Sequence, residues 1–204
     1  MGLATSALFG PTPVPEAIGL CERQLADDLR ERSTEGIICC MVARLHAMNG
    51  DASRAREHYR RGRSLLHELG QGVFAASTGL DVAAVELLSG DLGGAEAQVR
   101  TDLELLQRMG ETYFLASMAS YLGFLLRAQD REAEAFRLSE LAEQSAAADD
   151  ADAQALWRAL RAPLLARRGD LSVAEGLARE AVNLAGRTEA PILQADSRRE
   201  LARV

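Results

Sequence analysis

The feature that most constrains this chain is a turn that recurs about every forty residues. The four copies are centred on Gly50, Gly90, Asp130 and Gly169, so successive spacings are 40, 40 and 39 residues. A small residue precedes each turn by seven positions, and an alanine follows each by five. The two columns are Ala43, Ala83, Gly123 and Ala162, and Ala55, Ala95, Ala135 and Ala174. Because these positions keep the same spacing in all four units, they indicate a structural repeat. Units of this kind bury their apolar faces by stacking on their neighbours.

The residue types at the turn predict that each unit is a pair of antiparallel helices. Glycine suits the left-handed position that ends a helix. Asp130 stands where glycine is expected, and aspartate is one of the few other residues that tolerate this conformation. Asp51, Asp91 and Asp170 follow three of the turns, where a carboxylate can cap the next helix. Each small residue marks the crossing of two helices that approach closely.

The register predicts an all-α fold with two helices in each unit. The first helices are expected over 34–48, 73–89, 112–128 and 152–168, and the second helices over 52–69, 92–109, 131–147 and 172–186. Asp149-Asp150 is expected to begin the helix predicted over 152–168. Ser172 and Glu175 form a capping-box pattern at the start of the helix predicted over 172–186. Pro163 removes a helix hydrogen bond, so either packing tolerates a kink there or that helix is broken.

The ends of the chain fall inside repeats. Residues 1–15 are expected to be a Pro-rich linker or a disordered edge, and 16–204 to form one repeat domain. This domain divides into a half repeat 16–30, repeats of about 34–69, 73–110, 112–147 and 152–186, and a truncated repeat 191–204. The half repeat is expected to be a lone second helix over Glu16–Leu29. Such an arrangement lacks polar caps and predicts a slice of a longer solenoid.

A small residue, a glycine seven later and an alanine five beyond it resemble the tetratricopeptide repeat. The stretches Gly10–Val14, Glu16–Ile18, Asp149–Ala159 and Ala166–Gly169 resemble a particular variant of it. That variant lies C-terminal to the ATPase core of multidomain bacterial adenylate/guanylate cyclases and of transcription regulators similar to the maltose-regulon activator. The resemblance implies a right-handed α-α superhelix with about four helix pairs. It also implies a non-catalytic region that receives a signal or holds partners.

Composition narrows the classes of partner. The net charge is −7 and the pI about 5.1, which argues against direct nucleic-acid binding. All 23 basic residues are arginine, which we attribute to codon usage. No run of 18 or more apolar residues is present, so no membrane span is expected. Three thiols, two of them adjacent, do not make a disulfide framework, which favours a reducing cytoplasmic location.

No catalytic motif, metal site or cofactor site is predicted, and the chain is not expected to be an enzyme. His58 and His67 fall on opposite faces of one predicted helix, so they do not converge on a metal. Cys39 and Cys40 are interpreted as core residues. Five arginines lie close together on the helix predicted over 52–69. An acidic partner could dock on them, but the favoured interpretation is that they form a solvent-exposed outer face of the helix. They are Arg54, Arg56, Arg60, Arg61 and Arg63.

The surface predicted to bind a partner is the concave one, which the first helices line in this architecture. Its candidate residues combine aromatic, hydroxyl and guanidinium groups, a mixture typical of recognition surfaces. They are Arg44, Tyr113, Ser117, Ser120, Phe124 and Arg127. The predicted function is a protein-interaction or regulatory module that binds a protein, a peptide or another domain of a parent protein. Two alternatives are a small-molecule effector sensor and a scaffold that self-associates, for example as a homodimer, through its uncapped ends.

Overall fold

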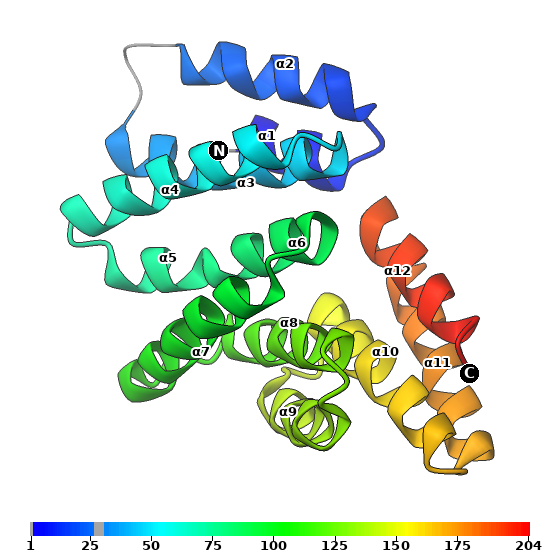
Figure 1. Cartoon of the computed structure of the whole chain (residues 1–204). Coiled ribbons are helices and arrows are strands. Elements are labelled where there is room, and N and C mark those ends of the chain that lie inside the picture. The colour runs from blue at the N-terminus through cyan, green and yellow to red at the C-terminus, as the bar shows by residue number, and fades with distance from the viewer. Residues whose placement is uncertain (1, 27–30) are drawn as a thin grey trace. The chain divides into compact units, whose positions relative to one another are not determined.

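The computed structural model of the chain describes residues 2–26 and 31–204, and these residues form helices and connecting turns with no strand (Figure 1). The helices are α1 (Gly2–Phe9), α2 (Val14–Leu25), α3 (Arg32–Met48), α4 (Ala52–Glu68), α5 (Gly72–Ser77), α6 (Gly79–Ser89), α7 (Leu92–Met109), α8 (Leu115–Ala128), α9 (Glu132–Ser145), α10 (Ala151–Arg167), α11 (Leu171–Ala185) and α12 (Pro191–Leu201). The all-α prediction is confirmed. Leu29, the predicted end of the lone helix Glu16–Leu29, lies outside the described residues.

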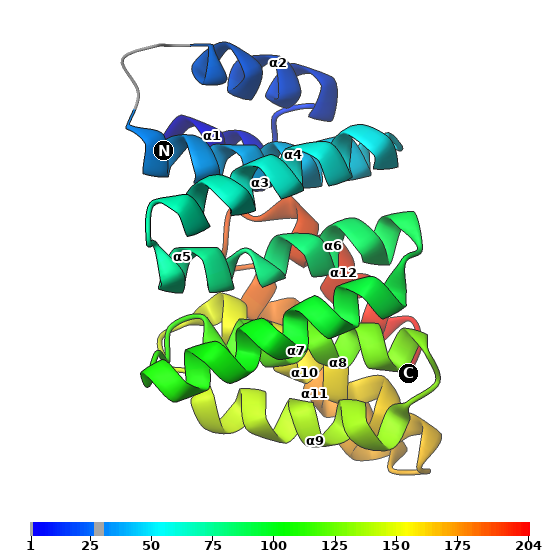
Figure 2. The ribbon, with the colours of Figure 1, turned by 60° about the vertical axis from the view of Figure 1, so that its left-hand side comes forward.

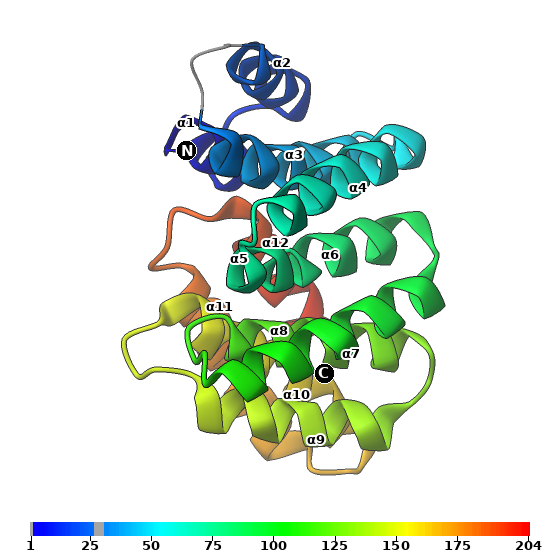
Figure 3. The same ribbon diagram turned by 90° about the vertical axis from the view of Figure 1, so that its left-hand side faces the viewer.

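The chain divides into two compact units, whereas the sequence predicted one repeat domain over 16–204. The N-terminal unit is Met1–Leu105 and the C-terminal unit is Leu106–Val204, with the boundary inside α7. In the N-terminal unit, α3 and α4 pair along their lengths and α6 packs on both (Figure 3). In the C-terminal unit, α8 pairs with α9 (Figure 2). In the same unit α10 pairs with α11, and α12 packs on α10 and α11 (Figure 1).

The first residues are a helix and not the expected linker. Ala4, Ala7 and Leu8 of α1 are buried, and α1 packs on α2 and α3. The apolar spacing of these three residues supplies a face that burial against neighbouring helices stabilises. As a result α2 is not a lone helix, because α1 is its partner. The prolines are confined to the connection after Phe9 and to the first turn of α2.

The turns have the backbone that the sequence predicted. Gly50, Gly90 and Gly169 have φ values of 82°, 100° and 92°, and Asp130 has φ 59°. The Oδ1 atoms of Asp51 and Asp91 accept hydrogen bonds from Arg54 N at 3.0 Å and Gly94 N at 3.1 Å. These caps and left-handed residues fix where each helix ends and the next begins.

The predicted helix 73–89 is interrupted at Thr78. The carbonyl oxygen of Ala75 accepts hydrogen bonds from Thr78 Oγ1 at 2.7 Å and from Arg63 Nη1 at 2.8 Å. Ser77 Oγ donates in the same way to Phe74 O at 2.8 Å. Phe74 O still accepts from Thr78 N at 3.2 Å, whereas side chains engage the Ala75 carbonyl that the regular helix ladder would otherwise use, and the chain divides there into α5 and α6.

Two other helix starts differ from the prediction. Helix α8 begins at Leu115 and not at 112, because the Glu111 carboxylate accepts hydrogen bonds from Tyr113 N at 2.8 Å and Phe114 N at 2.9 Å. Helix α11 begins at Leu171 with Asp170 at the N-cap, so Ser172 lies inside it and forms no capping box with Glu175. Asp150 does open α10, accepting from Ala153 N at 3.0 Å.

Pro163 does not break its helix. Helix α10 is continuous from Ala151 to Arg167, and Pro163 is buried within it. Of the two outcomes that the sequence allowed, the structure has the one in which packing tolerates the proline. Ala162 and Leu164, its neighbours, are also buried.

One stretch, Gly72–Ser89, is long and apolar enough by composition to cross a membrane, a test that core helices of soluble proteins also pass. In this structure it comprises α5, Thr78 and α6. Two carboxylates within it form ion pairs, Asp81 with Arg44 and Glu86 with Arg56.

Candidate functional site

The sequence-predicted binding residues of the C-terminal unit differ in exposure. Tyr113 is 72% exposed and precedes α8, whereas Ser117 is half-buried. Ser120 is fully buried, and its hydroxyl donates to Ala116 O at 2.9 Å. The expectation that Ser120 lies on an open surface is therefore wrong, because its helix face is packed into the unit.

Phe124 and Arg127 face other helices of the same unit. Phe124 and Tyr121 pack against a buried cluster formed by Ala155, Leu156, Ala185, Ala190 and Leu193. Arg127 Nη1 lies 2.7 Å from Glu200 Oε2 of α12, and both side chains are nearly buried. The Arg127 guanidinium also lies 5.4 Å from the centroid of the Phe124 ring. Both residues thus hold α8 to the helices that follow it, and the prediction that they are open to a partner is corrected.

Arg44 belongs to the N-terminal unit and is also covered. It is 8% exposed, its Nη1 lies 3.7 Å from Asp81 Oδ1, and its guanidinium lies 5.3 Å from the centroid of the Phe9 ring. Burial raises the pKa of Asp81 to about 6, although Arg44 opposes that shift. The six predicted residues are therefore split between two units, and they form no single exposed surface.

Four of the five arginines of α4 pair with carboxylates of the chain itself, and the fifth, Arg60, donates from Nε to Arg56 O at 3.2 Å. Arg56 forms two hydrogen bonds of 2.7 Å with the Glu86 carboxylate, and Arg61 Nη2 lies 2.6 Å from Glu35 Oε1. Arg54 pairs with Asp51 at 3.5 Å. Charges satisfied in this way leave little for an acidic partner, so the interpretation that they form a docking face loses its basis.

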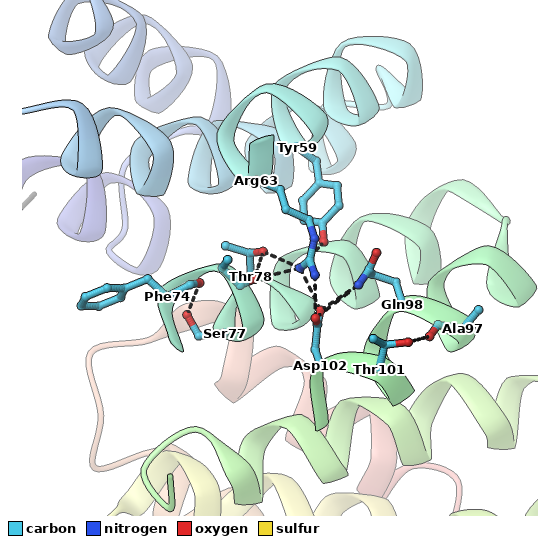
Figure 4. A network of polar contacts seen from close by, with 10 residues as sticks. Tyr59, Arg63, Phe74, Ser77, Thr78, Ala97, Gln98, Thr101 and Asp102 are labelled. Carbon is cyan, nitrogen blue, oxygen red and sulfur yellow. Dashed lines mark hydrogen bonds and ion pairs between the residues drawn. The ribbon is translucent and has the colours of Figure 1, made fainter. Parts of the chain in front are cut away.

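Arg63 is the centre of the most extensive of these networks (Figure 4). Its Nη1 and Nη2 donate to the Asp102 carboxylate at 2.9 and 2.6 Å, and Nη1 also contacts the Tyr59 hydroxyl at 3.3 Å. Gln98 Nε2 donates to both Asp102 oxygens at 3.2 Å. Burial raises the pKa of Asp102 against the lowering effect of Arg63. The network joins α4, the Thr78 break and α7, and its role is structural.

The exposed ring of Tyr113 instead borders a cleft of about 510 Å³ in the C-terminal unit. The cleft lies where the start of α8, the end of α9 and the start of α10 come together. Its lining residues are Thr112, Tyr113, Ala116, Ser145, Ala146, Ala147, Asp149, Asp150, Ala151 and Asp152. Burial, and then the neighbouring Asp150, raise the pKa of Asp152. Three carboxylates beside an aromatic ring suit a cationic group.

A second polar cluster lies in the N-terminal unit, where histidines of α3 and α4 stack. The ring centroids of His46 and His58 are 5.1 Å apart with an interplanar angle of 20°. Glu22 Oε1 of α2 lies 3.8 Å from His46 Nε2. Burial lowers the pKa of both histidines, and His46 adds to the lowering at His58. Both imidazoles are therefore neutral near pH 7 and carry a free lone pair.

Sequence reasoning missed this cluster because it compared only the two histidines of one helix. His46 lies on the preceding helix and Glu22 on the one before that. The three cysteines, by contrast, are buried and form no disulfide, and burial was expected for Cys39 and Cys40. Burial raises the pKa of Cys21 and of Cys40, so both thiols are protonated at neutral pH.

No family model matches the chain, and no curated protein matches it. The geometry therefore defines a class only, that of an all-α chain built from helix pairs.

Proposed function

We propose that this chain is a non-catalytic interaction module of the tetratricopeptide type that binds a basic segment of a partner protein or an adjacent domain. The proposal includes the right-handed superhelix and a place in a bacterial signalling or transcription-regulatory protein, both of which the sequence resemblance implies. It also includes the cytoplasmic setting that the cysteine content favours. Support comes from the helix pairs joined at equivalent left-handed turns, because repeats of this kind present surfaces for partners.

The observation that carries the proposal is the acidic cleft beside Tyr113. It replaces the wider concave surface expected from the sequence, since Ser120, Phe124 and Arg127 are engaged inside the unit. Tyr113 keeps most of its ring exposed, and Asp149 is an exposed residue of the same cleft. An exposed ring edged by carboxylates recognises arginine or lysine by cation–π contact and by charge.

Tyr113 and Asp149 should each contribute moderately to the affinity for a basic segment. A cation–π contact at an exposed site contributes about 0.5–1 kcal/mol, and an exposed ion pair contributes a similar amount. Removal of either should therefore weaken binding by roughly two- to fivefold. Binding should also weaken as salt is added, because the charges are solvent-exposed.

The test uses a fluorescein-labelled arginine-rich decapeptide and measures fluorescence anisotropy with the full chain. We expect Tyr113→Ala and Asp149→Asn each to weaken binding by roughly two- to fivefold. Glu140→Gln is the matched control, because Glu140 is an exposed carboxylate on α9 outside the cleft. It removes the same charge and should leave the affinity unchanged.

Equal weakening by Glu140→Gln and Asp149→Asn would mean that the peptide senses only the net charge of −7. Unchanged binding in both cleft variants would remove the cleft as the recognition site. Arg127→Glu provides a further comparison, since its effect should appear in the stability of the chain through the Glu200 contact and not in peptide affinity alone.

A further inference from the structure

The Glu22, His46 and His58 cluster places three potential metal ligands from three helices at one point. One ligand atom from each residue lies within 4.8 Å of the others. His46 is 2% exposed. Its Nε2 and the Nδ1 of His58 are buried, and neither has a hydrogen-bond partner among the described residues. The nearest carboxylate oxygen, Glu22 Oε1, is 3.8 Å from His46 Nε2, too far for a hydrogen bond.

Two unsatisfied nitrogens at one place require a physical explanation. Buried polar atoms in native proteins are almost always bonded to the protein, to ordered water or to an ion. Both atoms here are imidazole nitrogens, and a carboxylate lies beside them. A ligand that accepts lone pairs from all three would satisfy the whole cluster at once.

We propose that Glu22, His46 and His58 form a binding site for a divalent transition-metal ion, with Zn²⁺ as the preferred species. Imidazole nitrogen with one carboxylate is a donor set that suits zinc, whereas Mg²⁺ and Ca²⁺ require oxygen ligands throughout. Three protein ligands leave one tetrahedral position for water. The site is in the N-terminal unit, so it is independent of the cleft in the C-terminal unit.

The ligands can close onto an ion through side-chain movement alone. Zinc–ligand distances of about 2.0–2.1 Å place tetrahedral ligand atoms about 3.4 Å from each other. The Glu22 side chain is 48% exposed and has room to change rotamer. Nearby guanidinium charge is already neutralised, because Arg54 pairs with Asp51 and Arg61 pairs with Glu35.

A metal ion bound by these three residues would connect three helices. Glu22 lies on α2, His46 on α3 and His58 on α4. Helices α3 and α4 already pair along their length, whereas α2 packs on α1 and α3. A bound ion would therefore fasten α2 to both helices of the next pair, and metal availability would control how firmly it is held.

The test is metal binding by the full chain, prepared without a histidine tag and treated with EDTA. Zn²⁺ is titrated by calorimetry, and Co²⁺ serves as a spectroscopic probe. We expect one ion per chain, visible d–d bands for Co²⁺ without an intense thiolate-to-metal band, and a melting temperature that rises with Zn²⁺ concentration.

Glu22→Gln and His58→Gln are the test variants, because neither residue is fully buried and each chain should fold, as circular dichroism will check. Each should weaken Zn²⁺ binding by roughly tenfold or more. His67→Gln is the matched control, since His67 is an exposed histidine of the same helix α4. It should bind as the wild type does.

Wild-type affinity in both test variants would overturn the proposal, as would the absence of one-to-one binding at micromolar Zn²⁺. A thiolate band in the Co²⁺ complex would also overturn it, because it would place the ion on a cysteine. Loss of binding in His67→Gln alone would place the ion on His67 and would contradict the site.

Discussion

Asp130 holds a left-handed backbone, with φ 59°, at the turn between α8 and α9. Among the described residues other than glycine it is the one with positive φ. An L side chain disfavours this conformation because its Cβ approaches the following carbonyl oxygen. The equivalent positions hold Gly50, Gly90 and Gly169, so the third turn retains a steric cost that the other three avoid.

Asp130→Gly should therefore stabilise the chain by about 0.5–1 kcal/mol, after the larger chain entropy of glycine in the unfolded state is included. Urea unfolding at neutral pH measures the change. Gly169→Ala, the opposite change at an equivalent turn, should destabilise by about 1 kcal/mol. A destabilised Asp130→Gly variant would show that the aspartate side chain contributes more than its backbone costs.

At the residue scale, the turn and the small-residue columns were predictable and the ion pairs were not. A left-handed backbone position depends on the residue at that position, so a glycine or an aspartate at the turn is enough to predict it. The exposure of Arg127 depends on Glu200, 73 residues away, and nothing near Arg127 in the sequence marks that partner. The same holds for Arg44 with Asp81 and for His46 with His58. Helical periodicity assigns a side chain to a face, but it does not reveal what covers that face.

At the scale of elements, close backbone contact holds α3 against α4. A Cβ added at Gly62 would lie 2.5 Å from Gly36 O and 2.9 Å from Cys39 Cβ. The first of these atoms is backbone, so a larger residue can be accommodated only if the two helices move apart. The repeat columns did not include Gly36 or Gly62, because this contact occurs in one helix pair and not in every unit.

Gly62→Ala is therefore expected to destabilise the chain by about 1–3 kcal/mol, although alanine has the higher helix propensity. Gly176→Ala on α11 is the matched control, since its Cβ would meet no atom within 4 Å. There the propensity gain acts alone and should stabilise by about 0.5–1 kcal/mol. Thermal unfolding followed by circular dichroism compares the two, and equal shifts of the same sign would contradict the contact.

Helix boundaries show where local signals compete with longer-range contacts. The sequence predicted the ends of α3 and α4 closely, because Gly50 and Asp51 define the turn between them. It did not predict the break at Thr78, since Arg63 of another helix contributes to it by binding the Ala75 carbonyl. Nor did it identify α1, where the nearby prolines suggested a linker although Ala4, Ala7 and Leu8 supply a buried face.

At the scale of the whole molecule, several carboxyl groups are more costly to ionise in the folded chain than in the unfolded one. Burial raises the pKa of Asp81 to about 6, and it also raises the pKa of Asp102 and of Asp152. Between about pH 4 and 6 the folded chain therefore binds more protons at Asp81 than the unfolded chain does, and the raised pKa values of Asp102 and Asp152 act in the same direction. Their contribution to stability is greatest at low pH and is lost as pH rises through that window.

Asp81→Asn tests this effect, because asparagine resembles the protonated form at every pH. Relative to wild type, the variant should gain stability as pH rises from 4 to 7, by on the order of 2 kcal/mol over the range. The groups that face Asp81 are the Arg44 guanidinium and the Cys40 thiol. Urea unfolding at several pH values measures the difference, and a constant difference between pH 4 and 7 would contradict a buried carboxylate.

The left-handed turns also make the chain a practical frame for protein engineering. A Cβ built at Gly50, Gly90 or Gly169 would meet no atom within 4 Å, so each turn opens away from the packed helices. Turns of this kind accept inserted sequence with little effect on the elements they join. We therefore expect that a sequence inserted after Gly90 or Gly169 would be displayed at a defined point, whether it is an epitope, a fluorophore-binding peptide or a protease recognition sequence. Cleavage of an inserted protease sequence would divide the chain in the turn between two helices.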